Sequence, residues 1–376
     1  MLLRLLRSAR LRRRQAEPSA PSPAPPASGS RLHLLSRLAS FASGTELNIR
    51  GKEAPVESAD RSDQRELPIM EIVARAASLA AGDDALQAAT RARVQTYAQF
   101  FSAAARPATG INVFVYHVDL PDGEGIDYVD AKFSPQEFDY RYILARFIAR
   151  VREHCPGAMI YFVTSRGSRY RGFDAPDVAV VELPVEAAHP MYERACALLA
   201  YAESSAFTRD TVFLDSDAFV NRSLQAPFEF GFDVGLTYRD GPRLMPVNEG
   251  VLFLAARRPQ VVRAFLHRRM AVYDRLLGDP FIIEYYGDVR RWRGGQLSLN
   301  AVAYGLFPCS PYRAWDVAGA RVRLLPCDTY NFAGGEGEAS SSLERLDERY
   351  VVHFKGPRKY ALMFAAQAER TSMPGR

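Results

Sequence analysis

Residues 210–220 read DTVFLDSDAFV and combine strand-forming residues with two carboxylates. Thr211 to Leu214 are apolar or β-branched, which predicts a strand buried on both faces. Asp215 and Asp217 follow at once, two residues apart, so their negative charges repel each other. A divalent cation such as Mn²⁺ or Mg²⁺, which binds carboxylates and substrate phosphates, would relieve that repulsion. The alternative is a turn in which the aspartates only make local hydrogen bonds.

Strands alternate with helices on both sides of this stretch, from Gly110 onward. Apolar runs predict further strands at 111–118, 158–164, 177–183, 232–238, 250–256, 320–326 and 349–354. Amphipathic spacing predicts helices at 135–154, 190–205, 259–277 and 294–307. This alternation predicts an α/β domain whose mixed, mostly parallel sheet is flanked by helices. Ligands of such sheets bind beyond the carboxyl ends of the strands, where the two aspartates are expected.

The chain before this domain differs in composition. Of 48 basic and 43 acidic residues in the 376-residue chain, positions 1–66 hold 12 and 7, so the remainder is neutral. A neutral domain gives no support to nucleic-acid binding. We expect a basic, Pro- and Ser-rich, largely disordered arm at 1–66 and a helical extension at 67–108. The α/β domain would follow at 109–365 and a tail at 366–376.

The cellular location of the protein is predicted from two features that the sequence lacks, a long apolar run and a C-x-x-C pair. No apolar run reaches the roughly 18 residues of a membrane-spanning helix. The four cysteines form no C-x-x-C pair, which favours buried thiols over a zinc site. We therefore expect a cytoplasmic protein. The Arg-rich start is a solvated tail, a peripheral contact with an anionic membrane surface, or an organelle transit peptide.

Five segments, taken in order, resemble the nucleotide-sugar-dependent glycosyltransferases of the GT-A fold. They are VFLDSDAFVNRSL (212–224), PVNEGVLFLA (246–255), GGQLSLN (294–300), LPCDTYNF (325–332) and HFKGPRK (353–359). The pattern is most similar to glycosyltransferase family 8, the group of glycogenin and the bacterial galactosyltransferases, over about residues 111–360. The resemblance implies sugar transfer from a nucleoside-diphosphate sugar, expected to be a UDP-sugar, to a hydroxyl of a glycan, lipid-linked glycan or protein. It also implies retention of the anomeric configuration.

The resemblance assigns roles to individual residues. Asp215, Asp217 and His353 match the ligands of the Mn²⁺ or Mg²⁺ ion. Lys359 matches a lysine on the donor diphosphate. The other donor-binding candidates are Tyr116, His117, Arg194, Ser216, Asn248, Gly250 and Gly356. Glu249 and Gln296, together with Lys359, are the catalytic candidates.

The sequence departs from the family pattern at Gly295, where the family has an acid before the glutamine. Glu249 is a candidate substitute for that acid. Lys359 is also followed by Tyr360 and Ala361, where the family has Pro-Trp. Two alternatives therefore stay open: a non-catalytic GT-A-like binding or scaffold protein, and a phosphohydrolase of the haloacid dehalogenase type. In phosphohydrolases of the haloacid dehalogenase type, the acids follow the first strand of the domain, whereas several strands precede them in this sequence.

Overall fold

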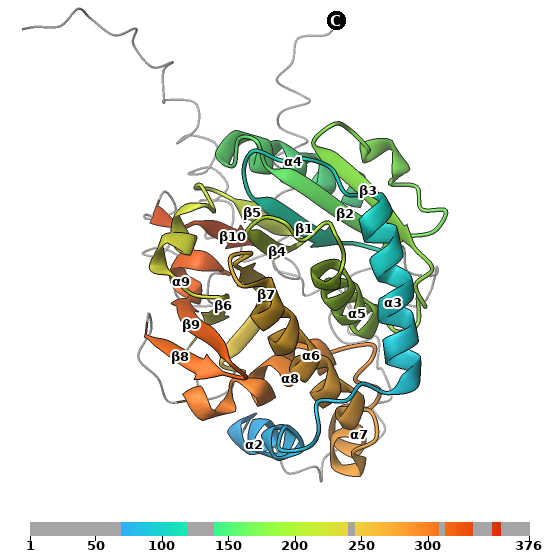
Figure 1. Cartoon of the computed structure of the whole chain (residues 1–376), viewed down its shortest axis with the longest axis vertical. Coiled ribbons are helices and arrows are strands. Elements are labelled where there is room, and N and C mark those ends of the chain that lie inside the picture. The colour runs from blue at the N-terminus through green and yellow to red at the C-terminus, as the bar shows by residue number, and fades with distance from the viewer. Residues whose placement is uncertain (1–68, 119–138, 240–244, 308–312, 334–347, 355–376) are drawn as a thin grey trace, which may run out of the picture.

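An eight-stranded sheet forms the centre of the fold (Figure 1). The computed structural model describes residues 69–118, 139–239, 245–307, 313–333 and 348–354. The strand order is β3-β2-β1-β4-β7-β6-β9-β8, in which β7 and β8 run opposite to the others. The strands are β1 (Asn112–Tyr116), β2 (Met159–Ser165), β3 (Val178–Leu183), β4 (Thr211–Asp215), β6 (Val234–Tyr238), β7 (Val247–Leu254), β8 (Ala314–Val317) and β9 (Ala320–Pro326). The predicted mixed, mostly parallel sheet is confirmed.

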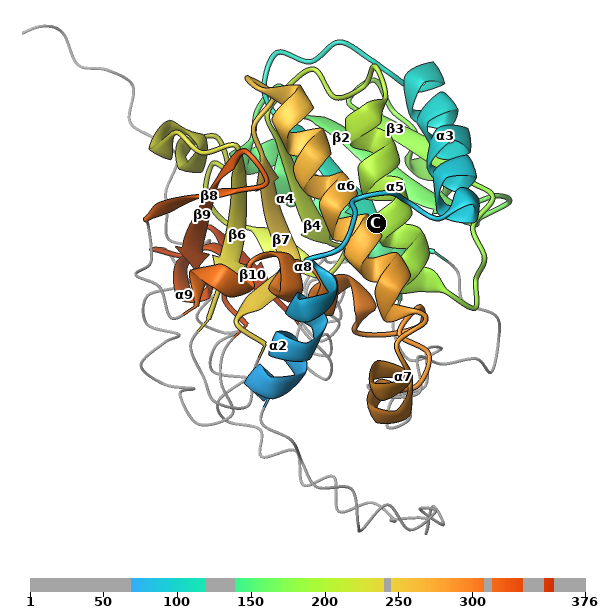
Figure 2. The same cartoon turned by 60° about the horizontal axis from the view of Figure 1, so that its bottom comes forward.

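Helices cover both faces of this sheet, because the side chains of its central strands alternate between two cores. Val113 and Val115 of β1 lie in one core with Phe147, whereas Phe114 and Tyr116 lie in the other. Figure 2 shows α5 and α6 side by side over the second face. The helices are α2 (Ile69–Leu79), α3 (Ala88–Ala103), α4 (Tyr140–His154), α5 (Pro190–Glu203), α6 (Pro259–Leu276), α7 (Pro280–Tyr286), α8 (Gly294–Val302) and α9 (Cys327–Tyr330), with 3₁₀ turns η2 (Arg171–Phe173), η3 (Ala226–Phe230) and η4 (Tyr304–Leu306).

Helix α5 is buried on nearly all sides, because α3 packs over it from outside. Polar contacts reinforce that packing: the Tyr97 hydroxyl of α3 donates to Glu193 of α5 at 2.5 Å, and Thr90 donates to Asp274 of α6 at 2.6 Å. Helices α2 and α3 thus share a core with the sheet. The domain boundaries proposed from the sequence stay predictions.

The last described strand does not join the main sheet. The strand expected at 349–354 is β10 (Val351–His353), and it pairs antiparallel with β5 (Ala218–Val220) in a separate two-stranded ribbon. Strand β4 already has β1 and β7 as neighbours, so no place beside it is open to a late strand. The strand expected at 349–354 therefore belongs to this ribbon and not to the main sheet, and the ribbon brings His353 to the acids.

Two smaller differences from the sequence prediction concern the end of one helix and one additional strand. Helix α8 stops at Val302 and continues as the turn η4, whereas the sequence pattern predicts one helix to residue 307. The sequence pattern does not predict the half-exposed strand β8, because this strand lacks an apolar run.

Within the described ranges, no helix is both long and apolar enough to cross a membrane. The predicted arm at 1–66, the tail at 366–376, Gly356 and Lys359 lie outside the described residues.

Candidate metal and donor site

Two strands end side by side where the candidate site begins. Tyr116 of β1 is in register with Asp215 of β4, so both strands reach the same carboxyl edge of the sheet. The chain turns there and continues into β5 after Asp217. The ribbon then places His353 opposite Ala218, next to that aspartate in the chain. The backbone N–H of Phe354 donates to the Asp217 carbonyl at 2.9 Å and fixes the two segments together.

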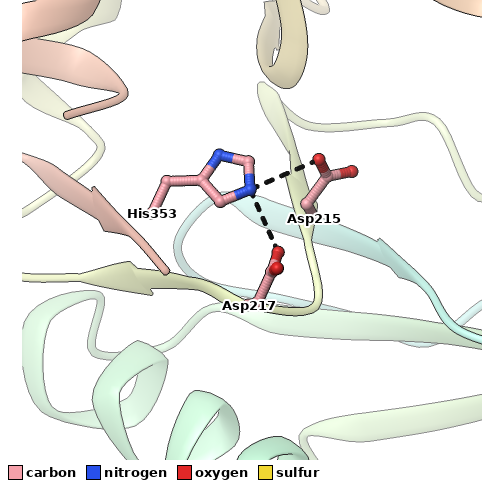
Figure 3. Close-up of side chains that lie close together, drawn as sticks. All are labelled: Asp215, Asp217 and His353. Atoms are coloured by element: carbon pink, nitrogen blue, oxygen red, sulfur yellow. Dashed lines mark ion pairs between the residues drawn. The ribbon is translucent and has the colours of Figure 1, made fainter. Parts of the chain in front are cut away.

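Asp215, Asp217 and His353 converge in this arrangement (Figure 3). His353 Nε2 lies 3.0 Å from Asp217 Oδ1 and 3.6 Å from Asp215 Oδ2. One ligand atom from each residue lies within 4.8 Å of the others, and His353 and Asp217 are buried. Two carboxylates and an imidazole suit a divalent cation such as Mn²⁺, which accepts oxygen and nitrogen ligands. The side chains that the sequence predicts as metal ligands are therefore brought together with a suitable donor set.

Gly250 of β7 lies directly against this cluster. A β-carbon at position 250 would stand 2.5 Å from His353 Cε1 and 2.8 Å from Asp215 Oδ2, closer than real β-carbons approach other atoms. The pairing of β7 with β6 jumps here, since Leu236 faces Leu252 while Thr237 faces Asn248. Such bulges re-aim a strand next to functional sites. The glycine thus leaves the space that two of the three candidate ligands occupy.

A buried chain of alternating charges runs from the metal cluster into the protein. Arg194 Nη1 donates to Asp215 Oδ1 at 2.6 Å, and the second Nη of Arg194 pairs with Glu249. Arg269, which is 1% exposed, pairs with the other oxygen of Glu249. Burial disfavours the Glu249 carboxylate, but the two guanidiniums outweigh burial and hold its pKa below the usual value. Glu249 is therefore an ionised carboxylate inside the protein.

Gly295 lies against the same carboxylate. A β-carbon at this position would be 2.5 Å from Glu249 Oε2 and 2.7 Å from Glu249 Oε1. Because Glu249 fills the space in which a side chain of residue 295 would begin, the two positions cannot both carry an acid without rearrangement. The departure from the family pattern at Gly295 has a steric counterpart in Glu249.

Three of the predicted donor-binding residues lie beside the acids. His117 Nδ1 is 3.2 Å from Ser216 Oγ, and its ring lies 4.5 Å from the ring of Tyr140. Tyr116 is buried, which raises the pKa of its hydroxyl well above the usual value. Its Oη has no hydrogen-bond partner among the residues that the structure describes. The three predicted positions 116, 117 and 216 thus form one group at the ends of β1 and β4.

The amide side chains of Gln296, Asn300 and Asn248 differ in their burial and in their hydrogen bonds. Gln296 is partly exposed in the first turn of α8. Asn300 is buried and clamps α8 to β7, since its side chain accepts from the Val247 N–H at 2.8 Å and donates to the Val247 carbonyl at 2.9 Å. Asn248 is also buried, and its Oδ1 accepts the backbone N–H of Gly250 at 2.9 Å. Its side chain therefore supports the bulge beneath the acids.

Two neighbours of the site are absent from the sequence prediction. Arg269 lies on the apolar stripe of α6, among Phe265, Met270 and Tyr273, and a charge on such a stripe is the signal for a buried ion pair. Asn331 lies in the quoted segment 325–332 without an assigned role. Its Oδ1 is 2.9 Å from His353 Nδ1.

Solved glycosyltransferase structures are similar to about two thirds of the chain. A glycosyltransferase that glycosylates the major capsid of PBCV-1 is 13% identical, with 69% of this chain and 100% of that one covered and a TM-score of 0.39. GlyE of Streptococcus pneumoniae TIGR4 is 11% identical, with 68% of this chain and 60% of that one covered and a TM-score of 0.41. The galactosyltransferase LgtC is 13% identical, with 68% of this chain and 96% of that one covered and a TM-score of 0.37. No family model and no curated protein matches the sequence.

Proposed function

We propose that the chain is a metal-dependent glycosyltransferase of the GT-A type. It would move a sugar from a nucleoside-diphosphate sugar to a hydroxyl acceptor. The observation that carries the proposal is the convergence of Asp215 and Asp217 with His353, which is remote from them in the sequence, at the carboxyl edge of the sheet. Chance acidic pairs are common, whereas a buried histidine aimed at both carboxylates points to a cation.

Asp215, Asp217 and His353 would hold Mn²⁺ or Mg²⁺. The ion would neutralise charge on the departing diphosphate, an effect worth several kcal/mol. We place His117 and Ser216 beside the nucleotide, with Tyr116 behind them. Lys359 and Gly356 are proposed to approach the diphosphate.

Arg194 and Glu249 have a second role in this proposal. Arg194 bridges Asp215 and Glu249, so it fixes the two carboxylates relative to each other. Glu249 would face the donor sugar in place of the acid that Gly295 lacks, with Gln296 near it at the start of α8. An ionised carboxylate there favours the positive charge that develops on the sugar ring as the anomeric bond breaks.

We propose a UDP-sugar donor and retention of configuration on the family resemblance alone. The acceptor would be a glycan, a lipid-linked glycan or a protein. We propose a cytoplasmic location, with residues 1–66 able to contact an anionic membrane surface.

The decisive experiment measures nucleotide release from a panel of nucleoside-diphosphate sugars with Mn²⁺, with and without sugar acceptors. Sugar transfer, or slow donor hydrolysis that a chelator abolishes, supports the proposal. Release of phosphate from phosphomonoesters would support the hydrolase instead. Donor binding without any turnover would support the scaffold protein.

A further inference from the structure

The side-chain amide of Asn331 contacts the imidazole ring of His353 on the side away from the aspartates. His353 Nδ1 lies 2.9 Å from Asn331 Oδ1, and both residues are buried. The two segments are also paired through their backbones, since the His353 N–H donates to the Phe332 carbonyl at 2.7 Å. The amide therefore faces the ring nitrogen opposite to the one that faces the aspartates.

The orientation of this amide follows from its other neighbours. Asn331 Nδ2 lies 2.9 Å from Asn248 Oδ1 and 3.0 Å from Thr237 Oγ1. Asn248 Oδ1 is an acceptor, because the backbone N–H of Gly250 donates to it. The Thr237 hydroxyl has a single proton, which it directs at the backbone carbonyls of Asn248 and Val251, so it also accepts. Both contacts require donors, and only the NH₂ group of Asn331 supplies them.

The other end of the amide is then the carbonyl oxygen, which can only accept. A ring nitrogen that faces it at hydrogen-bond distance must carry a proton, so Nδ1 is the N–H of His353. When a cation binds, Nδ1 keeps this proton, and Nε2, the atom directed at Asp215 and Asp217, supplies its lone pair (Figure 3). A metal ligand requires that arrangement.

We propose that Asn331 is a positioning residue that holds His353 in the Nδ1–H tautomer and so prepares Nε2 to bind the cation. The inference rests on the metal site of the proposed function. The network behind it begins at the bulge of β7, which lets the side chains of Thr237, Asn248 and Asn331 meet. Outer-shell partners of this kind contribute about 10- to 100-fold to metal affinity.

Mn²⁺ binding by calorimetry provides the first test. Asn331→Ala should weaken Mn²⁺ binding about tenfold or more. Asn112→Ala is the matched control, because Asn112 is an equally buried asparagine at the opposite end of β1, where it donates to the Tyr201 hydroxyl at 2.8 Å. The control should bind Mn²⁺ like the unsubstituted chain even if it unfolds more easily. In a His353→Ala background, Asn331→Ala should cause no further loss, which a merely structural role would not produce.

The tautomer is measured separately by ¹⁵N NMR of histidine in the metal-free protein, with His353 assigned from its loss in His353→Ala. A hydrogen-bonded proton on His353 Nδ1 is expected in the unsubstituted chain, whether or not Nε2 also carries one, and Asn331→Ala should lose that hydrogen-bonded proton. A ring without a proton on Nδ1 in the unsubstituted chain overturns the proposal even if no variant folds. Unchanged Mn²⁺ affinity in folded Asn331→Ala also overturns it. Failure of the unsubstituted chain to bind Mn²⁺ instead removes the metal site of the proposed function, whatever the tautomer.

Discussion

Gly250→Ala should damage the metal site through a single added methyl group. The new β-carbon would lie 2.5 Å from His353 Cε1, about 0.9 Å inside the 3.4 Å at which ordinary contact begins. It would also lie 2.8 Å from Asp215 Oδ2. Metal–ligand distances are defined to about 0.2 Å, so ligands displaced by several times that amount should bind at least tenfold more weakly. Overpacking should also cost about 1–3 kcal/mol of unfolding free energy.

Thermal unfolding with and without Mn²⁺ separates these two effects. At 100 times its dissociation constant, Mn²⁺ would stabilise the native chain by about 2.7 kcal/mol, and a tenfold weaker site would gain only about 1.4 kcal/mol at the same concentration. Gly305→Ala is the matched control, because nothing lies within 4 Å of a β-carbon there. It should keep the full Mn²⁺ effect. If Gly250→Ala gains as much from Mn²⁺ as the control does, the ligands do not lie where the geometry places them, and the steric reasoning fails.

Four further predictions concern the two aspartates, Glu249, Lys359 and residues 1–66. Asp215→Asn and Asp217→Asn should each abolish Mn²⁺-dependent nucleotide release in a folded protein. Asp215→Asn should also unfold more easily, because the partner of Arg194 at 2.6 Å loses its negative charge. Activity that survives both substitutions and a chelator would contradict the metal role. Glu249→Ala should reduce transfer at least tenfold, about 1.4 kcal/mol. Adding Gly295→Asp to Glu249→Ala should restore part of that loss, whereas Gly295→Asp alone should be harmful because Glu249 occupies its space; no rescue would argue against the exchange of acids. Lys359→Ala should lower the catalytic rate tenfold or more with little change in the Mn²⁺ concentration required, and an unaltered rate would remove this lysine from the mechanism. A chain that starts near Leu67 should keep its melting temperature within a few degrees and lose any binding to anionic vesicles, and loss of soluble protein would show that the arm packs on the domain.

The sheet and the acid pair could be predicted from the sequence because they depend on local patterns. The apolar run Thr211–Leu214 specifies a buried strand wherever it lies, and the aspartates that follow must emerge at its end. The placement of His353 could not be predicted in the same way. Strand β10 has only three residues, so its partner is decided by which edge is open in the folded protein.

The charged chain behind the metal cluster was less accessible to prediction. Arg194, Glu249 and Arg269 come from α5, β7 and α6, and no segment taken alone indicates that they pair with one another. Their pairing depends on the spacing of two helices over one strand, which local patterns do not encode. The role of Asn331 depends likewise on a register shift between β6 and β7.

The β5–β10 ribbon has a consequence for the biosynthesis of the protein. The acids lie on β4 and the turn after it, but the histidine arrives only with β10. A ribosome adds about 5–20 residues per second, and domains generally fold as units. The two aspartates therefore leave the ribosome well before the histidine that completes the cluster. The complete set of three candidate ligands cannot form until residue 353 has left the ribosome, so a partly synthesised chain lacks the full cluster.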